Sequence, residues 1–106
     1  MRRIIDGKVY DTKRAEELCN ISPDGFSRND LGWEDTHLYV TEKDTFFLAG
    51  KGGPLTRWTI LEGHSVHRSG KGMIVLGRDE ARRLVEQHCN RKTFVCLFGE
   101  AKEGVS

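Results

Sequence analysis

The chain has 106 residues, of which 37% are hydrophobic and 31% are charged, and its formal net charge at pH 7 is +1. This length suffices for one domain with a single core, and the composition excludes a disordered or membrane-spanning chain. The small net charge argues against a polyanionic DNA mimic and against a strongly basic nucleic-acid coat. We therefore expect residues 1–99 to form one compact domain and residues 100–106 to be a frayed tail.

A β-hairpin is predicted at the start of the chain. Asp6 and Gly7 separate two short runs of β-prone residues, and Asp-Gly favours a type I′ turn, in which both central residues have positive φ. This pattern predicts strands at residues 2–5 and 8–10.

A helix is predicted to follow at residues 12–20. Apolar side chains at positions 15, 18 and 19 have the i, i+3, i+4 spacing of one helical face. Residues 21–35 are rich in turn formers and contain Phe26 and Trp33, so we expect a loop that these two aromatic side chains anchor in the core.

The most regular β pattern lies between residues 36 and 53. Apolar and polar residues alternate on both sides of a charged turn, which predicts strands at residues 36–42 and 45–49 in the centre of a sheet. Gly50, Gly52 and Gly53 are expected to end the second strand in sharp turns.

The second half of the chain contains one clear strand and one clear helix. Residues 55–61 have no clean period and remain open between strand and loop, and residues 63–72 form the longest expected loop. The apolar run at residues 73–76 predicts a buried strand. Residues 78–89 have the spacing of an amphipathic helix, with acidic side chains in its first turn.

Residues 93–98 carry conflicting signals. Their β-branched and aromatic content favours a strand, whereas apolar side chains at positions 94, 97 and 98 and the following Gly99 favour a helix. The other elements predict an α+β fold, in which an antiparallel sheet of about five strands, made of two hairpins and one further strand, packs against two or three helices.

The three cysteines and the N-terminus indicate a cytoplasmic protein. No apolar run like that of a signal peptide follows Met1, and no segment approaches the ~20 apolar residues that span a bilayer. Cys19, Cys89 and Cys96 are an odd number in a chain without a secretion signal. We therefore expect buried, reduced thiols rather than a disulfide framework.

No motif in the chain defines a catalytic, cofactor or metal site. Two Gly-Lys-Gly segments, at residues 50–53 and 69–72, contain the residue types of phosphate loops, but both lack the Walker A spacing and hydroxyl, so sharp turns are the preferred interpretation. Zinc-ligand residue types occur without the spacing of a known finger or ribbon at four positions, His64, His67, His88 and Cys89. We therefore predict a protein that is not an enzyme and that needs no cofactor or metal.

The basic second half of the chain is the predicted partner-binding region. Residues 51–92 carry nine Lys or Arg against four Asp or Glu, and tryptophan and arginine are over-represented at interface hot spots. We expect a loop and a helix face to be exposed and to contact a protein partner through eight residues, Arg57, Trp58, His64, His67, Arg68, Lys71, Arg82 and Arg83. Core packing is the alternative role of Trp58.

A nucleic-acid-binding accessory protein is the alternative function. Its phosphate contacts would come from the basic residues of the same region, Lys51, Arg57, Arg68, Lys71, Arg78, Arg82 and Arg83. A solvated basic surface explains the same charges without a ligand.

An ordered set of segments, spanning about residues 2 to 99, resembles a family of small proteins encoded by phages and integrative elements. The segments are IIDGKVYDT at 4–12, GFSRND at 25–30, LY at 38–39, FLAGKGG at 47–53, EAR at 80–82 and FG at 98–99. The family usually has Glu at the position of Lys51, Trp-Ser-Gly-Gly at residues 67–70 and Pro at the position of Val75. These departures change the charge of loops that would contact a partner.

The resemblance implies a final short helix at residues 94–98, and we therefore expect a helix at 92–98. It also implies an accessory protein of a mobile genetic element, and such proteins often inhibit a host defence system. The leading prediction is thus an anti-CRISPR protein that binds a Cas effector complex in the cytoplasm of a host bacterium, with no membrane partner.

Overall fold

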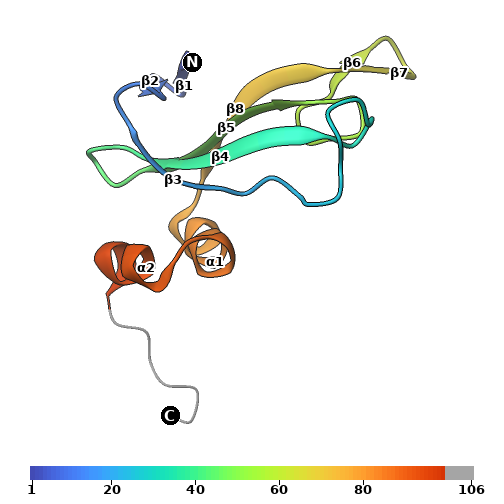
Figure 1. The fold of residues 1–106 in the computed structure, drawn as a ribbon. Coiled ribbons are helices and arrows are strands. Elements are labelled where there is room, and N and C mark those ends of the chain that lie inside the picture. Colours follow the sequence, from blue (N-terminus) through green and yellow to red (C-terminus); the bar gives the residue numbers. More distant parts are fainter. Residues whose placement is uncertain (100–106) are drawn as a thin grey trace.

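A four-stranded antiparallel sheet forms the centre of the computed structural model, which describes residues 1–99 (Figure 1). Its strands lie in the order β3–β4–β5–β8, with the bounds β3 Glu16–Asn20, β4 Glu34–Val40, β5 Phe46–Gly52 and β8 Gly70–Leu76. The tail expected at residues 100–106 lies outside the described residues.

The sheet lies between two different layers (Figure 1). The helices α1 Arg78–His88 and α2 Arg91–Phe98 cover one side, and the hairpin of β1 Arg2–Ile5 and β2 Lys8–Asp11 lies on the other. The α+β class and the antiparallel pairing predicted from the sequence are confirmed. The pair β1–β2 forms a small sheet of its own and does not join the central one.

Alternation along β4 and β5 gives the sheet two apolar faces. Leu38 and Leu48 belong to the core on the helix side. Phe47 points to the hairpin side, where its ring centroid lies 5.4 Å from that of Tyr10 and 5.2 Å from that of Tyr39. Both faces of the sheet are therefore covered over much of its length.

Local turn and cap signals are confirmed where they are strongest. Asp6 and Gly7 have φ values of 50° and 77°, as the type I′ turn requires. The Asn90 side chain accepts a hydrogen bond of 2.8 Å from Thr93 N–H and so caps α2, and Gly99 ends it with a φ of 88°. Residues 93–98 are therefore helical, as the resemblance implied. Of the two helices found in residues 1–99, neither is long and apolar enough to span a membrane.

The helix predicted at residues 12–20 is wrong. Ala15 N–H donates to the Asp11 carbonyl, which closes a turn, and the chain then pairs with β4 as the edge strand β3. The register shifts between Glu17 and Cys19, and this bulge lets the consecutive Leu18 and Cys19 both pack on the helix-side core. Pairing with β4 and this burial outweigh the weak helical spacing.

The long loop predicted at residues 63–72 is also wrong. The strands β6 Ile60–Glu62 and β7 Val66–Arg68 form a second hairpin, with Gly63 at a φ of 70° in its turn, and β8 begins at Gly70. The glycines at 50 and 52 lie inside β5 rather than in turns after it.

Cys19 and Cys89 form a disulfide, with their Cα atoms 5.7 Å apart. The expectation of three reduced thiols is therefore wrong for this pair, while Cys96 is a free, exposed cysteine. The bond joins the edge strand β3 to the residue that ends α1. The two cysteines are 70 residues apart in the chain, so no local pattern indicated that they would meet.

Candidate anion-binding groove

An open groove of about 800 Å³ lies where the end of β5 and the start of β8 meet β1 and the loop before β4. Four basic side chains and one acidic side chain line it, Arg3, Arg28, Lys51, Lys71 and Asp30. The Asp30 carboxylate already accepts a hydrogen bond of 2.8 Å from the Ser27 backbone N–H. The groove is therefore positively charged.

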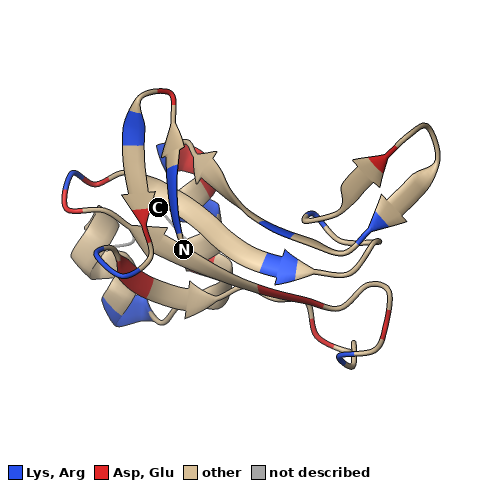
Figure 2. Ribbon diagram, turned by 90° about the horizontal axis from the view of Figure 1, so that it is seen from above, with Lys and Arg blue, Asp and Glu red and all other residues tan. Residues whose placement is uncertain are grey.

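Lys51 and Lys71 occupy directly opposed positions on β5 and β8. Opposed side chains in an antiparallel pair have Cβ atoms about 4.5–5.5 Å apart, and like charges in such a pair destabilise the sheet. Within residues 1–99 neither ammonium group has an ion-pair partner. Figure 2 shows Lys and Arg positions in blue on neighbouring strands of the central sheet.

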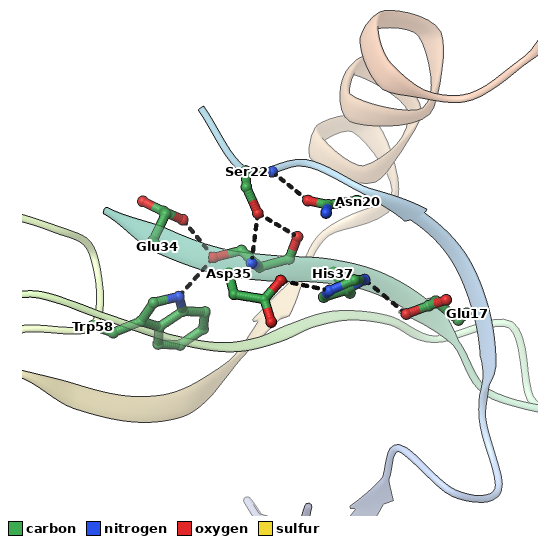
Figure 3. Close-up of polar contacts among 8 residues, drawn as sticks. Glu17, Asn20, Ser22, Glu34, Asp35, His37 and Trp58 are labelled. Carbon is green, nitrogen blue, oxygen red and sulfur yellow. Dashed lines mark hydrogen bonds and ion pairs between the residues drawn. The ribbon is translucent and has the colours of Figure 1, made fainter. Parts of the chain in front are cut away.

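The carboxylate nearest to Lys51 in the strand register is directed elsewhere. Asp35 pairs with Lys51 across β4 and β5, but its Oδ1 lies 2.8 Å from His37 Nε2. His37 Nδ1 in turn lies 2.7 Å from Glu17 Oε1, so both ring nitrogens face carboxylates (Figure 3). These acidic groups are thus gathered on β3 and β4, and among the described residues 1–99 the lysines on β5 and β8 have no ion-pair partner.

This acidic cluster also affects Tyr39. Burial raises the pKa of the Tyr39 hydroxyl above its ordinary value, and the Glu17 and Asp35 carboxylates raise it further. Tyr39 therefore stays neutral at physiological pH.

The glycines that flank the two lysines lie on the opposite, helix-side face of the sheet. Gly50 pairs with Gly72 and Gly52 with Gly70. A Cβ on Gly50 would lie 3.0 Å from Trp58 Nε1, and a Cβ on Gly70 would lie 2.7 Å from Ile60 Cγ1. The segment at residues 53–60 can therefore lie flat on the sheet because these positions have no side chain. The interpretation as sharp turns is wrong for these four glycines, whereas Gly53 does start a turn, in which its carbonyl accepts a hydrogen bond from Thr56 N–H.

Trp58 belongs to this segment, and its side chain is buried between the segment and the sheet. The expectation of a solvent-exposed Trp58 is therefore wrong. Its side chain belongs to the helix-side core and is 5% exposed, and its Nε1 donates a hydrogen bond of 2.7 Å to Thr36 Oγ1. The Thr36 hydroxyl donates to the buried Glu34 carboxylate, and Arg57 Nε lies 2.9 Å from Glu34 Oε2. Figure 3 shows Glu34 and Trp58 converging on this point of β4. Arg57 is thus exposed, as expected, but its guanidinium is ion-paired with Glu34.

The remaining residues of the predicted surface are exposed but do not form one patch. The β6–β7 hairpin carries His64, His67 and Arg68, and Arg68 Nη1 lies 3.0 Å from Glu62 Oε2. Arg82 and Arg83 lie on α1, which is far from the hairpin in both ribbon views (Figures 1 and 2). Lys71 is the one member of the predicted set among the groove residues.

Two groove residues, Arg28 and Trp33, lie on the loop that was expected to be anchored in the core by its aromatic side chains. The Arg28 guanidinium carbon lies 5.4 Å from the centre of the Trp33 ring, and both side chains line the groove. Trp33 is only partly buried, and Phe26 is 48% exposed, so the expectation that both aromatic residues anchor the loop in the core is wrong for Phe26. No periodic pattern marks this loop, so only the neighbouring basic residue could have drawn attention to Trp33.

In the described part of the chain, no group of three His, Cys, Asp or Glu side chains is placed to hold a metal ion. Comparisons of this chain with protein-family models, with curated proteins and with solved structures found no match.

Proposed function

We propose that the chain is a non-enzymatic protein that binds a polyanionic partner in the basic groove. The observation that carries the proposal is the direct opposition of Lys51 and Lys71 without an ion-pair partner within residues 1–99. Like charges in this position lower stability by a few tenths of a kcal/mol to about 1 kcal/mol. An anion that lies between them reverses the sign of this interaction, because each ammonium then faces an opposite charge.

The resemblance to small proteins of mobile elements suggests the biological process in which this binding takes part. We propose that the chain inhibits a host defence system by binding an effector complex, in the first instance a CRISPR effector, in the host cytoplasm. Effectors of this kind hold guide and target strands along positively charged channels. A basic groove on a small protein is suited to the phosphates of such a complex.

Lys71→Glu tests the role of the groove. The new carboxylate would face Lys51 across the strand pair, so the free energy of unfolding should stay unchanged or rise by up to about 1 kcal/mol. Inhibition should fall at least about tenfold, because a negative charge would repel the anionic partner. Phage plaquing on a host with an active CRISPR system measures inhibition, and urea denaturation measures stability.

Lys43→Glu is the matched control, because it makes the same substitution at an exposed position in the turn between β4 and β5, outside the groove and outside the predicted partner-binding residues. It should leave inhibition within about twofold of the unmodified chain, since exposed charges beyond a Debye length are largely screened. Equal loss of inhibition in both variants would point to net charge and not to the groove. Full inhibition by Lys71→Glu and by Lys51→Glu would remove the groove from the proposed mechanism.

A further inference from the structure

We infer that the polyanion held in the basic groove is a single-stranded nucleic acid, an inference that rests on the proposed binding function of the groove. The loop before β4 supplies the first reason. Trp33 and Arg28 line the groove from this loop, with the guanidinium carbon 5.4 Å from the ring centre. Unpaired bases stack on aromatic rings and on arginine guanidinium planes alike.

The lysines supply the second reason. Lys51 and Lys71 stand at opposed positions on neighbouring strands and both line the groove, as does Arg3. Ammonium groups act as point charges that follow a phosphate backbone without demanding one geometry. The groove therefore combines a charged track with an aromatic platform, which is the arrangement of sites that bind single strands without sequence preference.

Duplex DNA and an acidic peptide fit this arrangement less well. In a duplex the bases are stacked inside the helix, so Trp33 and Arg28 would have no base to contact. A peptide would add to the β8 edge through main-chain hydrogen bonds, but the Lys71 carbonyl oxygen already accepts one of 3.4 Å from Arg3 Nη2. The single strand is the ligand that uses both the basic side chains and the Trp33–Arg28 pair.

Binding of a fluorescently labelled oligothymidylate to the full chain tests the inference. Anisotropy titrations at several salt concentrations should give a log K that falls linearly with log salt, with a slope of about −2 to −3 for three or four phosphate contacts on a single strand. A duplex of equal length should bind at least about tenfold more weakly, because it cannot stack on the groove wall. Equal affinity for the duplex would overturn the inference.

Substitutions of Trp33 and its fluorescence report base stacking, which electrostatic attraction alone would not change. Trp33→Ala should weaken oligothymidylate binding by about 5- to 150-fold, while Trp33→Phe, which keeps an aromatic ring, should retain most of it. Stacking should also quench the fluorescence of the partly exposed Trp33 and leave that of the buried Trp58 unchanged. If Trp33→Ala alters stability, Trp33→Phe and the quenching measurement carry the test. Unchanged affinity in Trp33→Ala together with no quenching would overturn the inference.

The outcome also separates this inference from the proposed function. Loss of inhibition in Lys71→Glu, together with no binding of any oligonucleotide at low salt, would refute the single-strand ligand and leave the groove as the binding site. Binding of polyglutamate under those conditions would identify an acidic protein segment as the partner. Oligothymidylate binding that Lys71→Glu abolishes without any effect on inhibition would support the ligand and refute the inhibitory role.

Discussion

Replacing Trp58 with alanine should lower the free energy of unfolding by about 3–5 kcal/mol, the range for truncating a buried large aromatic side chain. Trp58 is 5% exposed, and a Cβ on Gly72 would lie 3.3 Å from its ring atoms. The cavity left behind would therefore lie against the helix-side face of the sheet, next to the glycines of β5 and β8. The change would also remove the indole N–H that donates a hydrogen bond of 2.7 Å to Thr36 Oγ1. Urea denaturation followed by circular dichroism measures the effect.

Trp58→Phe is the companion variant because it keeps an aromatic ring and removes only the indole N–H and part of the volume. Its destabilisation should be smaller, about 1–3 kcal/mol, which is the usual effect of an unsatisfied buried polar group. A native-like melt in Trp58→Ala combined with lost inhibition would contradict the core role. It would restore the interface role that the sequence alone suggested for this residue.

Removal of the Cys19–Cys89 disulfide should lower the free energy of unfolding by about 2–5 kcal/mol, because the cross-link closes a long loop in the unfolded chain. The relevant separation is 70 residues. Each kcal/mol corresponds to about 4–8 °C in Tm for a domain of about this size. Thermal melts of the double variant Cys19→Ala with Cys89→Ala, compared with the oxidised chain, measure the change.

Cys96→Ala is the control for that experiment, since Cys96 is exposed and unbridged. It should change Tm by no more than about 2–4 °C, as surface substitutions are usually within about 0.5 kcal/mol. Under non-reducing conditions, alkylation of the folded chain should modify one thiol and not three. Three reactive thiols in the oxidised protein would contradict the disulfide and would agree with the reduced state expected of a cytoplasmic chain.

The candidate site shows how far sequence patterns reach. Lys51 and Lys71 stand in two similar Gly-Lys-Gly segments, which contain the residue types of phosphate loops but were predicted to form separate sharp turns. In the structure the segments are neighbouring strands in register, so the two lysines contribute to one groove. The groove was missed because its other members, Arg3, Arg28 and Trp33, come from segments with no shared pattern, and only the fold brings them together.

Elements with strong local causes were determined by the sequence by itself. The Asp6-Gly7 turn, the amphipathic helix α1 and the α+β class follow from backbone preferences and from apolar spacing within a few residues. Tertiary structure decided the rest, because the competing interactions are between residues far apart in the chain. Pairing with β4 made β3 a strand. The close approach of residues 53–60 to the sheet required glycines in β5 and β8, and Trp58, which was expected at the surface, packs in the core. Each of these outcomes depends on what lies on the other side of a contact, and local propensity contains no information about that partner.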